Sequence, residues 1–231
     1  MADIAQLPLG RFIRPPAETG TEQPRVEIVL GYLVRHEQGT ILLDTGMGDA
    51  GQETEEWYRP ERVPLPEALQ RKGMGLADID LVVNCHLHFD HCGGNPLLAG
   101  TPIVAQRREL VAARGEDYTV PELVDYDGVR YEEVDGEIEL LPGVLVVPTP
   151  GHTEGHQSLV LRCSDGTVVL AGQSHDHTSE FAADVLSAQA RRDGVPPPLP
   201  LSPAWVDRLL DLDPRRVLFA HDASVWEPPG S

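Results

Sequence analysis

Three predicted β-strands of this chain each lead directly into a loop that carries histidine. These strands and histidines are residues 80–85 with His86, His88 and His91, residues 144–147 with His152, and residues 216–220 with His221. A single histidine is usually a surface residue or a hydrogen-bonded core residue, but three strand ends that all deliver histidines rarely arise by chance. The fold must therefore bring distant strand ends together, and the clustered imidazoles indicate a metal site.

The motif His-Leu-His-Phe-Asp-His at residues 86–91 has a spacing that suits two adjacent metal positions. In an extended segment, residues two apart point the same way, so His86 and His88 can hold one cation between them. Asp90 and His91 follow one turn later and can face a second cation position nearby. A catalytic zinc site needs three protein ligands and one open position. His152, in a loop bounded by glycines, is a natural third ligand.

The charge and the cysteine content exclude several classes of partner. The net charge is −19, from 37 acidic and 18 basic residues, and a field of that sign repels nucleic acid and anionic lipid. No apolar run approaches the ~20 residues that cross a bilayer. The N-terminus lacks the charged-then-apolar order of a signal peptide. The three cysteines cannot form a closed disulfide set, so we expect a cytoplasmic protein that binds neither nucleic acid nor membrane.

Predicted strands and helices alternate along the chain, which is typical of an α/β fold. Further strands are predicted at residues 26–34, 40–43, 103–105, 157–162 and 168–171, and helices at residues 66–72, 107–114 and 203–212. We find no linker long enough to separate two domains, so we expect a single domain over residues 1–231. Residues 34–43 and 161–170 share a strand, a turn and the pattern Gly-Thr followed by apolar residues, which suits a fold made of two similar halves.

Three segments are interpreted as variable loops that could shape a substrate pocket: residues 48–63, 116–131 and 178–200. Their aromatic side chains are candidates for an apolar lining, namely Trp57, Tyr58, Tyr118, Tyr126 and Phe181. Cys85 precedes His86 within a strand, so we expect its thiol to point into the core and not to bind metal.

The motifs HLHFDHCGGN at residues 86–95 and PGHTEGHQS at residues 150–158, followed by His221, resemble the metallo-β-lactamase superfamily and most of all its N-acyl-homoserine lactonase branch. The resemblance implies an αββα sandwich of two similar halves. By position, it implies a first metal held by His86, His88 and His152 and a second held by Asp90, His91 and His221. It also implies that Asp44, in Leu-Leu-Asp-Thr-Gly, supports a ligand from outside the coordination sphere.

One position departs from this family pattern. The family places an aspartate that bridges both metals after a strand ending in glycine, and here Gly172 is followed by Gln173. A glutamine carbonyl can coordinate, but it brings no charge to offset a second cation. We therefore expect one tight Zn²⁺ site and a second site that is weak or empty, with Mn²⁺ or Fe²⁺ as alternative metals. His175 and Asp176 are candidate replacement ligands, although Asp176 stands where the lactonases carry a substrate-contacting tyrosine.

These residues predict a metal-dependent hydrolase of an ester-like bond, and a lactone is the favoured substrate. Metal-bound hydroxide would attack the acyl carbon of a small molecule, and Asp90 would orient the nucleophile and pass its proton to the leaving group. One alternative is a thioesterase or cyclase that acts on a carrier-bound or small thioester in a biosynthetic pathway. An alternative of another class is a non-catalytic metal-binding or sensor protein. The sequence leaves the oligomeric state open.

Overall fold

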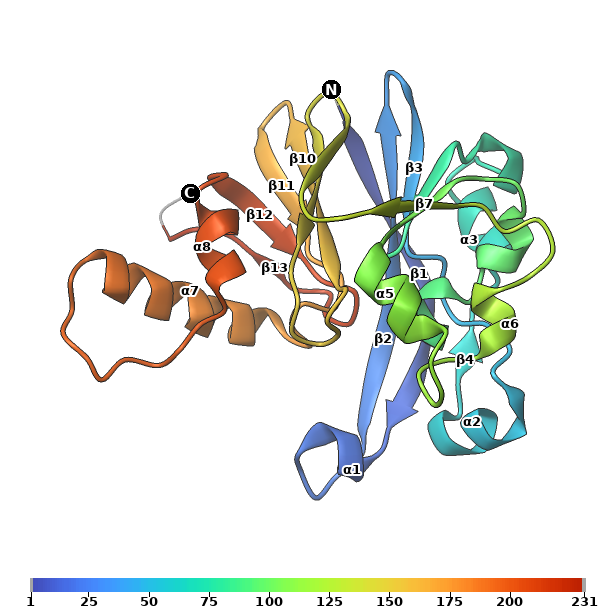
Figure 1. Ribbon diagram of the computed structural model, residues 1–231, viewed down its shortest axis with the longest axis horizontal. Coiled ribbons are helices and arrows are strands. Elements are labelled where there is room, and N and C mark those ends of the chain that lie inside the picture. The colour runs from blue at the N-terminus through green and yellow to red at the C-terminus, as the bar shows by residue number, and fades with distance from the viewer. Residues whose placement is uncertain (1, 230–231) are drawn as a thin grey trace.

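The computed structural model describes residues 2–229, and within them two β-sheets lie face to face with helices on their outer sides (Figure 1). The first sheet has the strand order β4-β1-β2-β3-β5-β6-β7, and the second has the order β13-β12-β11-β10-β9-β8. The strands of the first sheet are β1 (Asp3–Arg14), β2 (Arg25–His36), β3 (Gly39–Leu43), β4 (Glu61–Arg62), β5 (Leu81–Val83), β6 (Ile103–Gln106) and β7 (Tyr131–Val134). Those of the second are β8 (Ile138–Leu141), β9 (Val144–Pro148), β10 (Gln157–Cys163), β11 (Gly166–Leu170), β12 (Pro214–Leu218) and β13 (Val225–Trp226).

Short helices follow many of the strands and carry the chain between them. The α-helices are α1 (Pro16–Thr19), α2 (Gly51–Tyr58), α3 (Leu65–Gln70), α4 (Phe89–Cys92), α5 (Arg107–Ala113), α6 (Pro121–Val124), α7 (Thr178–Arg192) and α8 (Ala204–Leu210). Two 3₁₀ turns lie at η1 (Leu76–Asp78) and η2 (Asn95–Leu98). No helix within residues 2–229 combines the length and the apolar character that a membrane span requires.

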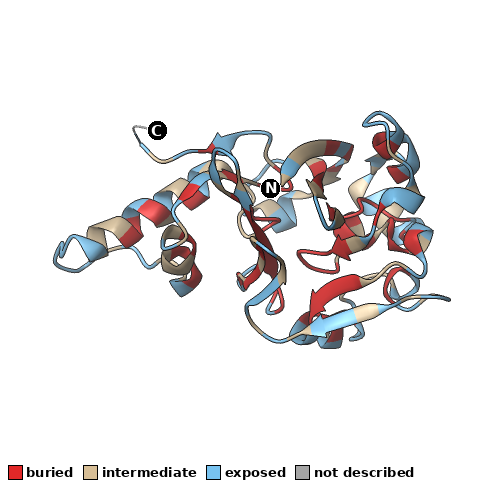
Figure 2. Ribbon diagram, turned by 90° about the horizontal axis from the view of Figure 1, so that it is seen from above, coloured by how far each residue is buried: buried red, intermediate tan, exposed pale blue. Residues whose placement is uncertain are grey.

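The main core lies between the two sheets. Along β2, Leu30, Tyr32 and Val34 enter this inner layer, whereas Val29 and Leu33 point to the opposite face, as the period of two of a strand requires. The second sheet contributes alternate residues to the same layer, among them Val146 and Leu159. Buried residues accordingly follow the strands of both sheets (Figure 2). Because each sheet is apolar on both faces, each also needs helices on its outer side.

The prediction of an α/β sandwich with two similar halves is confirmed. The repeated segments form equivalent hairpins, in which Val34 pairs with Ile41 in β2–β3 and Leu161 pairs with Val168 in β10–β11. Each repeat thus supplies the central hairpin of one sheet. Every strand and helix predicted above is present, with ends that differ by a few residues.

The interpretation of residues 178–200 as a pocket loop is wrong. Residues Thr178–Arg192 form α7, which packs with α8 on the outer face of the second sheet. Phe181, Val185 and Ala188 are buried there at helical spacing, so Phe181 belongs to the core and does not line a pocket. Helices α2 and α6 likewise lie within the other two predicted loops. The missed strand β1 contains Pro8 and Gly10, and its register shifts between them, so its alternation is interrupted.

Candidate metal centre

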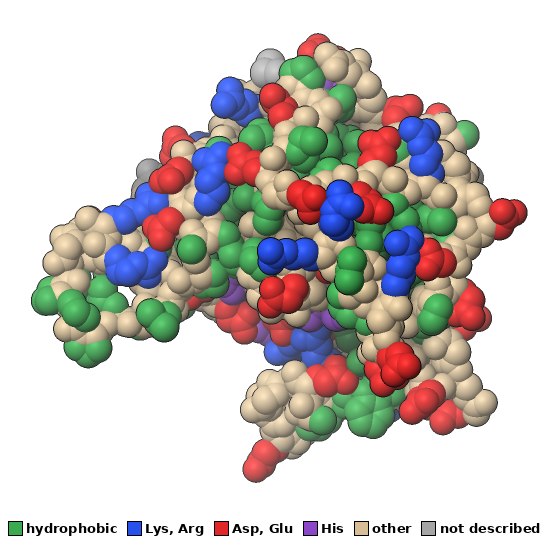
Figure 3. Space-filling view, in the orientation of Figure 1, with side chains coloured by type: hydrophobic (Ala, Val, Ile, Leu, Met, Phe, Trp, Pro, Cys, Tyr) green, Lys and Arg blue, Asp and Glu red, His purple; other side chains and the backbone are tan. Residues whose placement is uncertain are grey.

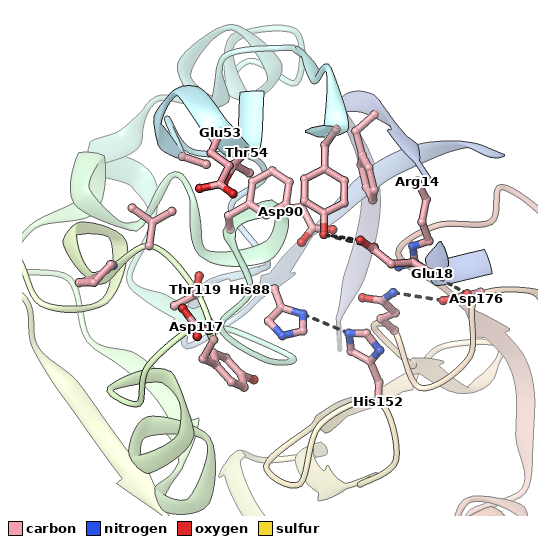
Figure 4. A pocket seen from close by; sticks show the side chains of 18 residues that line it. Arg14, Glu18, Glu53, Thr54, His88, Asp90, Asp117, Thr119, His152 and Asp176 are labelled. Carbon is pink, nitrogen blue, oxygen red and sulfur yellow. Dashed lines mark hydrogen bonds and ion pairs between the residues drawn. The ribbon is translucent and has the colours of Figure 1, made fainter. Parts of the chain in front are cut away.

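The first group of candidate ligands comprises His86, His88 and His152, which we term the first triad. His86 and His88 follow β5, and His152 lies in the loop between β9 and β10. His86 Nε2 is 3.0 Å from His88 Nδ1, and His152 Nε2 is 3.2 Å from the same His88 atom. The contact between His88 and His152 is visible in Figure 4. Three ring nitrogens therefore converge on one point.

The second group, which we term the second triad, comprises Asp90, His91 and His221. Asp90 and His91 lie on α4, and His221 follows β12. The Nε2 atoms of His91 and His221 are 3.2 Å apart, and Asp90 Oδ2 lies 3.3 Å from His91 Nε2 and 3.4 Å from His221 Nε2. His221 Nδ1–H donates to the carbonyl of Ile28 at 2.7 Å, which leaves Nε2 free to bind metal. All three side chains are buried.

Asp44 contacts His91 of the second triad and Cys85, the residue before His86. It follows β3 in the left-handed region, with φ of 59°, and its carboxylate accepts from the backbone N–H of Cys85 at 2.9 Å. His91 Nδ1–H donates to Asp44 Oδ2 at 2.9 Å, so His91 Nε2 faces the other ligands. Asp44 therefore has the supporting geometry that the resemblance implies for it.

Cys85 is buried as expected, but its thiol lies against the candidate ligands. Its Sγ is 3.0 Å from Asp44 Oδ2, 3.2 Å from His86 Nδ1 and 3.3 Å from His91 Nδ1. The thiol can donate to Asp44 and accept from His86 Nδ1–H, which leaves His86 Nε2 for a metal. Strand alternation did not indicate this contact, because β5 ends at Val83 and Cys85 already lies in the loop that follows.

Glu109 is a buried residue of α5 that sequence reasoning missed. Its carboxylate accepts from the backbone N–H of Leu87 at 2.7 Å and from the Thr153 hydroxyl at 2.8 Å. It also accepts a hydrogen bond from the Tyr118 hydroxyl. Glu109 thus ties the loop of His86 and His88 to the loop of His152. Its position on a predicted helix carries no signal that separates it from a solvated glutamate.

Gln173 lies beside the second triad, whereas the two candidate replacement ligands do not join it. Gln173 Oε1 is 3.2 Å from His91 Nε2, and its backbone N–H donates to His156 Nε2 at 3.1 Å. His175 Nε2 instead lies 3.0 Å from Asp184 Oδ2, and its ring contacts Phe181 and Trp205. Asp176 accepts from Arg14 and Arg25, both at 2.7 Å.

Members of both triads line an open pocket of about 920 Å³, namely His88 and His152 of the first and Asp90 of the second. Histidine side chains are visible in the hollow on the lower side of the molecule, next to acidic and basic groups (Figure 3). Apolar lining comes from Phe12, Tyr58, Phe89 and Val120, and the pocket also reaches Tyr118. Of the predicted aromatic lining, Tyr58 and Tyr118 line this pocket, Trp57 borders a smaller adjoining one, and Tyr126 donates its hydroxyl to the Asn95 carbonyl.

Burial and neighbouring charges shift the pKa values of the site in opposite directions. Burial lowers the pKa of His88 to about 3 and that of His221 to about 4. Burial also opposes charge on His91, but the neighbouring Cys85, Asp90 and Asp44 outweigh it and raise the pKa of His91 well above 6.5. For Asp90, burial raises the pKa, but the His91 charge and hydrogen bond prevail, and the net shift is downward.

The donor atoms of each triad lie within 4.8 Å of one another, which is close enough for them to share one metal ion. In the first triad, three imidazole nitrogens face each other without a carboxylate or carbonyl acceptor among them. Nitrogen-rich sites of this kind suit Zn²⁺ and related transition metals. The residues present therefore fit a metal centre of two adjacent positions.

The sequence profile of the metallo-beta-lactamase superfamily matches residues 24–221, from β2 to the last candidate ligand. The chain belongs to the metallo-beta-lactamase superfamily. An N-acyl homoserine lactonase of Bacillus thuringiensis is 31% identical over 206 residues, covering 83% of this chain and 80% of that protein. One from Bacillus cereus is 34% identical over 165 residues, covering 66% of each protein. The latter match therefore spans just under two thirds of the relative's length.

Solved structures of lactone-hydrolysing enzymes share this fold. An N-acyl homoserine lactone hydrolase with the product N-hexanoyl-L-homoserine at its catalytic metal centre has a TM-score of 0.76 and 27% identity. That match covers 95% of this chain and 93% of the other. The dizinc quorum-quenching lactonase AidC shares the fold at a TM-score of 0.67 and 15% identity, covering 100% of this chain and 95% of its own. The resemblance inferred from the histidine motifs is thus confirmed.

Proposed function

We propose that this member of the superfamily is a metallo-hydrolase that opens a lactone, with a small acyl compound as substrate. The observation that carries the proposal is the convergence of two ligand triads, of which His88, His152 and Asp90 reach the wall of one open pocket. The lactonase relatives, at 31% and 34% identity, support the same substrate class. Direct attack by water also fits this site, because Cys85 and Cys92 are fully buried and the described residues that line the pocket include no serine or cysteine.

When bound, a divalent metal would supply Lewis acidity to the substrate carbonyl and make water at the site more acidic. Asp90 lines the pocket, and its lowered pKa keeps the carboxylate ionised at neutral pH. As a carboxylate it would orient a water molecule, and in this proposal it takes the proton that this water loses on attack and returns it to the alkoxide that leaves when the ring opens. The pocket, which is open to solvent, admits the water that this reaction consumes.

The apolar side of the pocket suits the acyl portion of the substrate. Phe12, Tyr58 and Phe89 pack against one another, with ring centroids 5.3 to 6.1 Å apart. This cluster lies on the wall beside Asp90 and gives an acyl chain an apolar surface next to the reacting carbonyl.

We propose that Zn²⁺ fills the first triad tightly and the second weakly, with Mn²⁺ or Fe²⁺ as alternatives. The charge balance supports this difference, because Asp90 is the one carboxylate among the six ligands and Gln173 adds none. A second dication in a partly buried site then lacks an anion to offset it. The cytoplasmic location also stays a prediction.

Metal counting and a substrate panel test the proposal together. After dialysis against metal-free buffer, we expect one equivalent of Zn²⁺ per chain, and a second only when excess Zn²⁺ is present. Acyl lactones should be hydrolysed faster than thioesters of the same acyl group. Preference for the thioester would favour a thioesterase, and metal binding without hydrolysis of any activated acyl compound would favour a sensor.

A further inference from the structure

Gln173 is held in one orientation by its neighbour Asp176. Gln173 Nε2–H donates to Asp176 Oδ1 at 3.1 Å, so Oε1 is on the side of the second triad, 3.2 Å from His91 Nε2. The glutamine side chain is buried, and the two ends of its amide differ only in whether they donate or accept. Asp176 can only accept, so the donor end of the amide must face it.

Asp176 is itself held by a pair of arginines. Arg14 and Arg25 are cross-strand partners in β1 and β2, and both donate to Asp176 Oδ2 at 2.7 Å. Like charges directly opposite one another are unfavourable in a sheet, so this pair needs anions beside it. Asp176 provides one and the buried Glu27 the other. Figure 4 shows Arg14 next to Asp176 on the wall of the pocket.

We propose that Asp176, anchored by Arg14 and Arg25, is a positioning residue that aims the carbonyl oxygen of Gln173 at the second metal position. This inference rests on the metal centre of the proposed function, and it explains how a ligand of the weaker second site is oriented. Both oxygens of Asp176 are used, Oδ1 by Gln173 and Oδ2 by the two arginines. The carbonyl oxygen of Gln173 is therefore directed at the second metal position by the carboxylate at residue 176.

The isosteric variant D176N separates this role from a merely structural one. The single oxygen of asparagine goes to the two charged arginines, so its NH₂ group faces Gln173. Gln173 must then present its carbonyl to residue 176 and turn its own NH₂ toward His91 and the metal position. We expect the second Zn²⁺ to bind roughly 10- to 100-fold more weakly, while the first Zn²⁺ is unaffected. D176A removes the acceptor without offering a donor, so its loss should be smaller.

The effect of D176N should reverse when residue 173 is a glutamate. Q173E is isosteric and brings a carboxylate to the second site, where its charge should strengthen binding, although it faces the carboxylate of Asp176. In the double variant Q173E/D176N, the asparagine NH₂ donates to the glutamate and this repulsion disappears. D176N should therefore weaken the second site beside Gln173 and strengthen it beside glutamate.

The measurement is a titration of the metal-free full chain with Zn²⁺ by calorimetry and with Co²⁺ by absorption, on the wild type and the four variants. Melting temperatures of the metal-free proteins and the first equivalent of Zn²⁺ report whether each variant is folded. The sign reversal, with a smaller loss in D176A than in D176N, supports the proposal. Equal effects of D176N in both backgrounds, or a second site that takes neither metal in any of these proteins, would overturn it. Failure of the wild type to hydrolyse lactones counts against the proposed function alone.

Discussion

The two triads lie side by side but differ in how they are supported. The first has three imidazoles and no carboxylate, and its members reach from the buried His86 to the exposed His152. The second is buried throughout and contains Asp90, with Asp44 and Gln173 in contact with His91. In the metal-free protein, the carboxylates beside His91 favour a proton on that ring, whereas burial keeps His86 and His88 neutral. The first triad is thus ready for a metal, and the second must first release a proton.

Removal of a ligand from the first triad should have the largest effect. In His86→Ala, we expect the tightly bound Zn²⁺ to be lost and lactone hydrolysis to fall by more than about 1,000-fold, because the metal supplies the main Lewis acid. Metal counting and initial rates check this result. His36→Ala, at the end of β2 and away from both triads, is the matched control and should retain metal and activity. Equal activity in the two variants would contradict the assignment.

A change in the second triad should be less severe. Asp90→Asn keeps the shape of the side chain but removes its charge and its ability to accept a proton. We expect the first Zn²⁺ to stay bound and kcat to fall roughly 100- to 1,000-fold. The comparison of the two triads would fail if this variant lost the first Zn²⁺ as readily as His86→Ala.

The Cys85 thiol should affect the first triad moderately. Cys85→Ala removes the partner of His86 Nδ1, so the affinity for the first Zn²⁺ should fall by about 10- to 100-fold. Cys85→Ser keeps a group that can both donate to Asp44 and accept from His86, and it should restore most of the affinity. Competition with a chromophoric chelator measures both. If serine and alanine behave alike, the thiol acts through packing only.

The smallest effect concerns the pH dependence of the metal-free protein. The pKa of His88 falls from 6.5 to about 3 and that of His221 to about 4 on folding, so below pH 6.5 the unfolded chain takes up protons that the folded chain refuses. The contribution of these groups to the free energy of unfolding should therefore decrease as the pH falls from about 6.5 to about 4. His91 has its pKa raised, so it opposes this trend near pH 6.5, where the unfolded ring is only partly protonated, and adds little slope below about pH 5.5.

Denaturant unfolding of metal-free protein across this pH range checks the sign. His88→Asn removes one of the histidines whose pKa is lowered and should flatten the dependence, whereas His91→Asn should leave the slope below about pH 5.5 unchanged. A metal-free protein that grows more stable toward pH 4 would show that the histidines are protonated in the folded state.

Much of the fold followed from local pattern. The pattern shared by residues 34–43 and 161–170 predicted two equivalent hairpins, which are β2–β3 and β10–β11. The helical spacing of Phe181, Val185 and Ala188 is also present in the sequence, within the segment that we interpret as a pocket loop. The interrupted alternation of β1 hid the strand that carries Arg14.

The candidate site also combines features that the sequence predicted with contacts that only the structure revealed. The residue types and spacing of the histidine motifs by themselves determined the chemistry, because imidazole nitrogens at strand ends have few other uses when they gather. Only the tertiary structure decided what supports those residues: Glu109 between two loops, the Cys85 thiol beneath His86, and the arginines from β1 and β2 that hold Asp176. Such contacts join residues far apart in the chain, and a hydrogen bond depends on orientation that no local pattern encodes.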